Sequence, residues 1–423
     1  MTSRSRAGHG PDAGGSADSA PLGFLVALGA PAAGLALGVT VISTYLPVLV
    51  EQTTNAVVIG ALVGGEGFFG IFMPTLLGAF SDRTARRVRD RVVLLVGCAV
   101  VLALALLAVG VVAELSPHVL VWYVVALVFV YAAYYGYLAP YWALYPDLVP
   151  RDRSGRSRSA ESTWRVTGVG LALVGGGLLL DVAAGLPFFV AAAAVVCATV
   201  VLLVGLRSRM DRAVVIDADR GRLSGTRRLM GDPAIRRLCL AEGLWNFALS
   251  SLRAFVVLFF VVGMHRSSSF VSTVIFPLVA VGIAIAAPTA GWIADRWGHL
   301  RLLLTALVVY AAGMALPGIW QETWVIAAIP LVAMGAATVM TLPFSVLMRL
   351  LPEGNHGAAS GLFGLCRGLG ATLGPVLTGA VIVLVRPVMD GTEGYAAMWL
   401  CCSAILFLSV PLLWGLRHDD RIH

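Results

Sequence analysis

The sequence is dominated by long apolar runs without charged residues, and a helix needs roughly 20 such residues to cross a bilayer. A membrane-spanning β-strand would instead be an alternating segment of about ten residues. Dividing the chain at charges and turn residues predicts twelve spanning helices. They are expected at residues 23–50, 56–79, 92–113, 119–145, 160–183, 186–206, 236–263, 269–293, 300–319, 323–348, 358–385 and 395–416. The predicted fold class is an all-α membrane protein.

Composition leaves little of the chain for anything outside the membrane. Charged residues make up 13% and hydrophobic residues 59%, whereas soluble domains carry about 25% charged residues. The connections are short, so the sizeable sensing domain of a receptor is not expected. The basic surplus consists of Arg alone, and we interpret it as a topology signal, with no nucleic-acid partner.

The residue types that build metal centres and active sites are poorly placed here. All seven His lie in loops, termini or span ends, and the six Cys lie inside apolar runs. A His relay or intramembrane metal site is therefore disfavoured, and the Cys are expected to act as small hydrophobic residues. A phosphate-binding loop of the G-x-x-x-x-G-K-[ST] type is impossible without Lys. We expect no cofactor, no metal and no enzyme activity.

The Arg residues indicate the orientation. Those in the connections lie on one side of the predicted bundle, with Arg266 and Arg386 as the two exceptions. Cytoplasmic connections accumulate positive charge. We therefore predict a multi-pass plasma-membrane protein with both termini in the cytoplasm.

The longest polar connection, residues 207–235, separates a first half at 23–206 from a second half at 236–416. Residues 1–22 and 417–423 are the predicted cytoplasmic termini. The segment from Gly78 to Arg83 recurs as the segment from Gly291 to Arg296, and residues 148–168 resemble residues 350–370. Two similar segments in the same order predict two pseudo-symmetric six-helix halves.

These halves, the central connection and a G-x-x-x-D-R-x-G-R-R loop after span two resemble the major facilitator superfamily. The first copy has Ala85 in place of the usual Gly, and the second keeps only Arg301 of the basic cluster. The motif residues are Gly78, Asp82, Arg83, Arg86, Arg87, Gly291, Asp295, Arg296 and Gly298. The resemblance implies a secondary transporter that binds a small-molecule substrate in the lipid bilayer, and we expect a monomer.

The loop motif has a physical interpretation. Gly78 and Gly291 would allow helices to approach closely, and a carboxylate followed by Arg can interact with helix ends. The resemblance implies that Asp82 and Arg83 stabilise the outward-facing state, with Asp147 as a candidate partner. The alternative is that these charges only set the topology.

Ionisable residues inside spans are costly and mark pathways or ion pairs. Glu66 lies twelve residues before Gly78, roughly 18 Å along the helix and near the middle of the bilayer. Desolvation at that depth favours a protonated carboxyl group. Glu66 is therefore the expected proton-coupling residue, with a structural ion pair as the alternative. Arg253 is a candidate to approach it across the two halves.

Span seven carries four polar residues at spacings of 4, 4 and 3, namely Glu242, Asn246, Ser250 and Arg253. These spacings place them on one helix face. A lipid-facing row of this polarity would be costly, so we expect the face to line an interior pathway. Glu242 is expected to pair with Arg236 or Arg237 at the cytoplasmic end.

Span four carries a row of tyrosines, Tyr134, Tyr137, Tyr141 and Tyr145. Each offers an apolar ring and a hydroxyl group, which suits sugars or aromatic compounds. Packing between helices is an equal alternative. Glu161 and Arg165, four residues apart, are expected to form an ion pair within one helix.

The leading functional hypothesis is a transporter coupled to protons, or to another cation. An acid in span two before the Ser81–Thr84 loop resembles sugar symporters of the superfamily and favours sugar-type uptake. The alternative is proton-driven export of drugs or metabolites. Exporters of the family usually carry an Arg in span four and G-x-x-x-G-P-x-x-G-G in span five, whereas here the similar run, Gly370 to Gly379, is in span eleven. A membrane-embedded enzyme or a receptor is a remote alternative.

Overall fold

The computed structural model describes residues 22–149, 154–211, 230–350 and 356–417. No β-strand occurs in these ranges. They contain twelve helical segments that are long and apolar enough to cross a membrane. The predicted fold class is confirmed.

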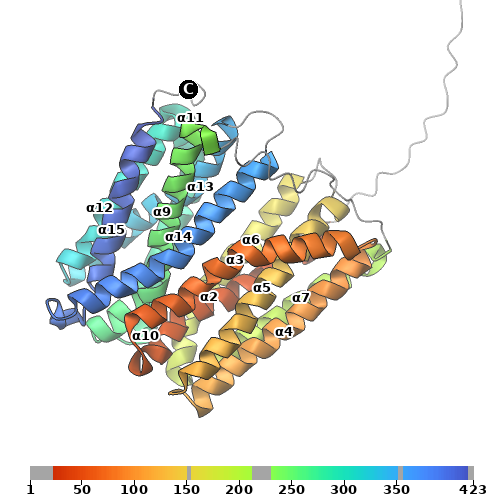
Figure 1. Ribbon diagram of the computed structural model, residues 1–423, viewed down its shortest axis with the longest axis horizontal. Coiled ribbons are helices and arrows are strands. Elements are labelled where there is room, and N and C mark those ends of the chain that lie inside the picture. The colour runs from red at the N-terminus through yellow and green to blue at the C-terminus, as the bar shows by residue number, and fades with distance from the viewer. Residues whose placement is uncertain (1–21, 150–153, 212–229, 351–355, 418–423) are drawn as a thin grey trace, which may run out of the picture.

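The helices form two groups, coloured red to yellow-green and green to blue in Figure 1. The first group consists of α1 (Leu22–Gly29), α2 (Pro31–Val50), α3 (Ala56–Thr84), α4 (Val88–Leu115), α5 (Leu120–Leu148), α6 (Ser154–Val182) and α7 (Leu186–Leu206). The second consists of α9 (Pro233–Leu258), α10 (Ser268–Phe270), α11 (Phe276–Trp297), α12 (His299–Ile319), α13 (Ile329–Leu350), α14 (His356–Val385) and α15 (Ala397–Trp414). Short turns extend them: η1 (Glu51–Thr53), η3 (Arg207–Arg209), η4 (Phe259–Gly263), η5 (Val271–Ile275), η6 (Thr323–Ala328) and η7 (Asp390–Thr392).

Local sequence explains where several helices begin and end. The side chain of Asn55 accepts a hydrogen bond from the Val58 amide at the start of α3, at 3.1 Å. Asp232 does the same for Ala234 at the start of α9, where Pro233 occupies the first turn. Gly298 lies between α11 and α12 and has a φ of 88°. Residues with a Cβ rarely adopt this conformation, so glycine is favoured at this position.

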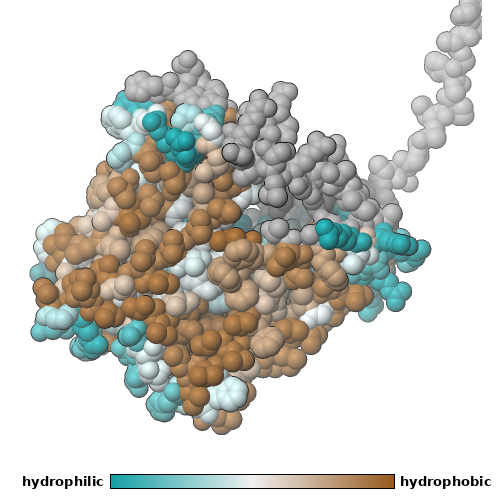
Figure 2. Space-filling view, in the orientation of Figure 1, coloured by the Kyte–Doolittle hydropathy of each residue, from teal (hydrophilic) through white to brown (hydrophobic). Residues whose placement is uncertain are grey.

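The helices α2 and α9 lie at the centre of the molecule and contact each other. In their most apolar stretches 78% and 72% of the residues are buried, against 22–44% in the other ten spans. Apolar residues around most of α2 suit it to this position, whereas α9 places its polar residues Glu242 and Arg253 against partners inside the molecule. The other spans expose large apolar side chains, and Figure 2 shows brown apolar surface along the sides of both groups with teal polar residues near the ends.

The two ends of the molecule differ in the number of arginines in their connections. The Arg-rich end is where α3, α7 and α15 end and α4 begins (Figure 1). The opposite end is where α2 and α14 end and α3 begins. In Figure 1, α3 and α14 converge at the opposite end and diverge toward the Arg-rich end.

Candidate functional site

An ion pair between Glu66 and Arg253 joins the two groups in the middle of the molecule. The carboxylate is on α3 and the guanidinium on α9, with 3.6 Å between Oε2 and a terminal nitrogen. The exposed fractions of their side chains are 13% and 31%. The predicted approach of these residues is confirmed. An ion pair partly shielded from solvent at this depth can respond to a proton or to a charged ligand.

Aromatic rings surround this ion pair. Tyr131, Tyr134 and Tyr135 on α5 lie close enough to interact electrostatically with Arg253. The Tyr131 hydroxyl donates to the carbonyl oxygen of Leu62 at 3.1 Å. The buried Nε of Arg253 makes no hydrogen bond with any described residue.

Sequence reasoning missed Tyr131 and Tyr135, although a signal for them exists on α3. A Cβ on Gly65 would lie 3.3 Å from the Tyr131 ring, and one on Gly70 would lie 2.9 Å from Tyr135. The glycines of α3 therefore make room for the rings that flank Glu66. Counting aromatic residues along α5 alone could not reveal this fit.

The predicted tyrosine row divides between two environments. Tyr134 lies near the ion pair, but Tyr137 and Tyr141 are fully buried inside the first group. The Tyr137 hydroxyl lies 3.3 Å from Thr199 Oγ1 on α7, and the Tyr141 hydroxyl donates to the Leu28 carbonyl at 2.9 Å. The pathway prediction is wrong for Tyr137 and Tyr141, because one face of α5 meets different neighbours along its length.

A second ion pair lies nearer the Arg-rich end. Glu242 on α9 accepts hydrogen bonds from Nε and a terminal nitrogen of Arg367 on α14, at 3.1 and 2.9 Å. The Asn246 amide donates to the same carboxylate at 3.0 Å. The expected partnership of Glu242 with Arg236 or Arg237 is wrong. Arg367 occupies the Glu242 carboxylate, and Arg237 donates to the Gly415 carbonyl oxygen instead.

The polar row of α9 therefore has several partners. Glu242 faces α14 and Arg253 faces α3, while Asn246 donates to Glu242 within α9. Ser250 is buried between Asn246 and Arg253 along the helix, with an exposed fraction of 3%. Glu161 and Arg165 form the predicted ion pair within α6, at 3.5 Å. The Arg165 and Arg367 side chains remain 59% and 56% exposed. Because lipid contact would be costly for them, we infer that they face water between the groups.

The first loop motif is arranged differently from the prediction. A Cβ on Gly78 would meet no described atom within 4 Å, so this glycine mediates no close approach to a described helix. Arg83 and Arg86 are exposed, and the Asp82 side chain lies outside the described part of the structure. Arg87 pairs with Asp211 at 3.6 Å.

Arg91, which follows this motif, pairs with Asp147 at 3.2 Å, and both side chains are almost fully buried. Asp147 thus has a basic partner one turn into α4, and its predicted partnership with Asp82 and Arg83 in the outward-facing state stays a prediction. Sequence reasoning counted Arg91 among the topology charges. The sequence did carry a signal for this ion pair: Arg91 precedes one apolar run, and Asp147 follows the next one.

In the second loop motif, Asp295 and Arg296 are exposed in the last turn of α11. The Arg296 guanidinium lies 3.9 Å from the centroid of the Trp292 ring. Gly298 supplies the positive φ described above. The surroundings of Gly291 lie outside the described residues, so its predicted packing role stays a prediction.

Glycines bring α3 and α14 into close contact toward the opposite end. A Cβ on Gly60 would lie 2.1 Å from the Pro375 carbonyl oxygen, and one on Gly64 would lie 2.5 Å from that of Thr372. Small residues allow such backbone approach between membrane helices. The contact joins the first group to the second from the opposite end to the level of Glu66.

Hydrogen bonds join the groups at the same end. Asp181 at the end of α6 accepts from the amide of Ser269 at 3.1 Å and from its hydroxyl group. The Ser272 hydroxyl lies 2.9 Å from that of Tyr45 and accepts from the Gly177 amide at 3.1 Å. The structure is therefore closed at the opposite end.

Within the described ranges, no group of three or more His, Cys, Asp or Glu side chains is arranged to hold a metal ion.

The chain can be compared with known proteins. A family model described as Major Facilitator Superfamily matches residues 32–375 and 265–422. The multidrug resistance protein MdtG of Dickeya zeae is 25% identical over 281 residues, which cover 64% of this chain and 65% of that protein. The matched segment thus spans about two thirds of this relative.

Solved structures share the fold. A bacterial homologue of the human lysosomal transporter Spinster, in an inward-facing and occupied conformation, gives a TM-score of 0.73 at 16% identity and covers 92% of this chain and 95% of its own. The nucleoside transporter NupG gives 0.73 at 15% identity, with coverages of 94% and 100%. At these identities the likeness concerns the fold alone.

Proposed function

Because the chain belongs to the major facilitator superfamily of transporters, we propose that it is a monomeric, proton-coupled exporter of organic compounds. Glu66 binds the proton and Arg253 is its counter-ion. The observation that carries this proposal is the 3.6 Å ion pair that joins the two groups beside three tyrosines. Midplane sites between two halves are the usual substrate and ion sites of such transporters.

The Arg-rich end faces the cytoplasm in this proposal, and the membrane is the plasma membrane. The placement of nearly all loop arginines at that end supports the orientation. The present conformation is then inward-facing. The halves at residues 23–206 and 236–416 rock against each other, and a proton and a small-molecule substrate bind between them in turn.

The coupling follows from the charge of Glu66. An ionised Glu66 attracts Arg253 and favours the conformation in which the two approach each other. A proton removes this attraction and competes with substrate for the pair, because substrate binds from the cytoplasm while Glu66 is ionised and a proton replaces it on the external side. Proton binding from the external side and release to the cytoplasm would thus drive the return step.

The loop after α3 has a separate role in the proposal. In the outward-facing state, Asp82 and Arg83 latch the Arg-rich end, and the second motif does so with Asp295 and Arg296. The exposure of Arg83 and Arg296 in the present conformation is compatible with a latch that closes only in the other state.

Export is favoured over the sugar-type uptake expected from the loop sequence. The matched relatives are named multidrug resistance proteins. The tyrosine row that suggested a sugar site has two members buried in packing, and Asn246 is engaged with Glu242. Rings around one ion pair suit aromatic or lipophilic compounds better than polyhydroxylated ones.

The test uses purified protein at pH 6 and pH 8 with lipophilic dyes, drugs and sugars. A ligand at 100 times its dissociation constant should stabilise the protein by about 2.7 kcal/mol in thermal unfolding. We expect stabilisation by drug-like compounds whose affinity differs between the two pH values, and loss of that difference in Glu66→Gln. In proteoliposomes, the same variant should no longer move substrate against its gradient under a pH difference.

Glu161→Gln is the matched control, because Glu161 is also a buried glutamate paired with Arg, but within one helix. It should keep the pH dependence. A pH dependence that survives Glu66→Gln would refute Glu66 as the coupling residue. Stabilisation by sugars alone would replace export by uptake.

A further inference from the structure

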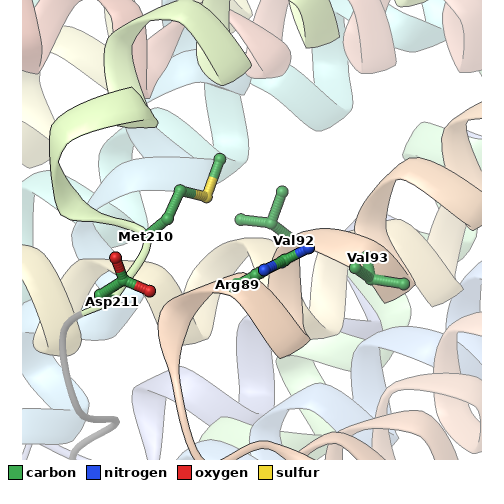
Figure 3. Close-up of a pocket in the computed structure, with 5 residues that line it drawn as sticks. All are labelled: Arg89, Val92, Val93, Met210 and Asp211. Atoms are coloured by element: carbon green, nitrogen blue, oxygen red, sulfur yellow. The ribbon is translucent and has the colours of Figure 1, made fainter.

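A hollow of about 370 Å³ lies at the Arg-rich end, well away from the Glu66–Arg253 pair. Arg89, Val92 and Val93 line it from the first turns of α4, and Met210 and Asp211 line it from the segment after α7 (Figure 3). The backbone amide of Arg89 donates to the Met210 carbonyl oxygen at 3.0 Å, which holds the two walls together. A second hollow of about 350 Å³ is also lined by Val93, together with Phe80, Thr84, Asp90 and Leu94.

Alternate arginines at this helix start have different partners. Arg87 pairs with Asp211, and Arg91 pairs with Asp147 inside the protein. Arg89 is exposed and makes no ion pair with a described residue. Its guanidinium is therefore the available cation of the hollow.

The nearby acids are already engaged. Asp90 accepts hydrogen bonds from the amides of Arg86 and Arg87, both at 2.9 Å, in the cap of α4. Asp211 is 85% exposed and pairs with Arg87 at 3.6 Å. Additional positive charge comes from Arg207, which is exposed at the end of α7. The local balance favours an anionic ligand.

Exposed apolar residues beside the hollow indicate that the ligand is a membrane lipid. Val93, Val100 and Leu104 are 65%, 52% and 60% exposed, and their spacing places them on one face of a spanning helix. Val204 on the neighbouring α7 is 54% exposed. An apolar track therefore runs from the hollow toward the middle of the membrane.

The depth of the hollow agrees with this track. Arg89 and Arg207 lie near the ends of the spans Val88–Leu115 and Leu186–Arg209. The ends of spans lie at the level of lipid headgroups. Arg binds phosphate through parallel hydrogen bonds, and basic pockets between helices at a membrane surface recognise anionic headgroups.

We propose that this hollow binds an anionic glycerophospholipid from the leaflet at the Arg-rich end. Its phosphate contacts Arg89, and one acyl chain lies along Val93 and Val100. The proposal does not depend on which substrate the protein transports.

The test is native mass spectrometry of the full chain in detergent, with phosphatidylglycerol and phosphatidylcholine of identical acyl chains. We expect preferential retention of phosphatidylglycerol. Arg89→Gln should weaken the binding of phosphatidylglycerol about fivefold, because one Arg near an anionic surface contributes roughly 1 kcal/mol. Arg89→Lys should retain most of the binding, because it keeps the charge.

Arg301→Gln is the matched control, since Arg301 lies in the first turn of α12, the corresponding helix start of the second group. It should leave retention unchanged. Val93→Gln, which keeps Arg89 but makes the track polar, should weaken the lipid as well. Inorganic phosphate at millimolar concentration should not displace it.

Three results would overturn the proposal. One is equal retention of phosphatidylglycerol by the wild type and Arg89→Gln, and another is equal retention of the two lipids by the wild type. The third is displacement by inorganic phosphate together with an unaffected Val93→Gln variant, which would indicate a site for free anions.

Discussion

Ion pairs within the spans differ in burial, and burial decides what each can do. Arg91 and Asp147 are closed off from solvent, whereas Arg253 remains accessible beside Glu66. Desolvation opposes the attraction in a buried pair, so such a pair contributes little net stability, but loss of one partner leaves an uncompensated charge. The Arg91–Asp147 pair is therefore structural, and the accessible pair can exchange partners.

Arg91→Met should lower the free energy of unfolding by about 3–5 kcal/mol, because it removes the cation that lies 3.2 Å from the buried Asp147 carboxylate. The double variant Arg91→Met/Asp147→Leu should recover most of this loss. Arg86→Met removes an exposed arginine of the same segment and should change stability by no more than about 0.5 kcal/mol. Denaturant unfolding in detergent measures all three, and a double variant no more stable than the single one would refute this account.

At the scale of elements, the important contact is between α3 and α14. Glycines along α3 meet backbone carbonyls of α14, so the helices touch without intervening side chains. The glycine run of α14 contributes on two sides: Gly379 lies against α3, and Gly370 and Gly374 lie against α9. The exporter-like run therefore packs against two helices, one from each group, in this conformation.

Gly60→Ala should disrupt that contact, because its Cβ would lie 2.1 Å from the Pro375 carbonyl oxygen. Overpacking of this kind costs about 1–3 kcal/mol. We expect a lower unfolding temperature and greater labelling, by a water-soluble reagent, of a cysteine placed at Ser269. Gly97→Ala in α4, where a Cβ meets nothing within 4 Å, is the control. Equal effects of the two substitutions would contradict the assignment of the α3–α14 contact as the closure.

At the scale of the whole molecule, the described hydrogen bonds between the groups lie toward the opposite end. Asp181 and Ser269 make one of them, and Tyr45 and Ser272 another. A transporter that alternates access must break these contacts to open at that end. The opposite end is therefore the place at which a covalent link would stop the cycle.

Asp181→Cys/Ser269→Cys, in a background without the native cysteines, should form a disulfide that abolishes transport in proteoliposomes. Reduction should restore it. The control pair Arg386→Cys/Glu393→Cys lies at the same end but within the second group, where the native residues form an ion pair. It should leave transport intact when oxidised. Full transport by the oxidised Asp181/Ser269 pair would show that this end does not open.

The sequence alone determined the twelve spans, because apolar length is a property of each segment by itself. It also predicted the Glu161–Arg165 pair, which needs only helical spacing. Some boundaries moved by a few residues: α4 begins at Val88, before the expected 92, because Asp90 caps it.

The tertiary structure decided which polar residues meet. Whether Tyr134 or Tyr137 lies near Glu66, and whether Glu242 pairs with Arg237 or Arg367, depends on which neighbour each helix face meets. The approach of Glu66 to Arg253 was anticipated as a candidate, but only packing could establish it. Helical periodicity fixes the angle of a side chain around its own axis, and the contacts between separate helices depend on how close their small residues let them come.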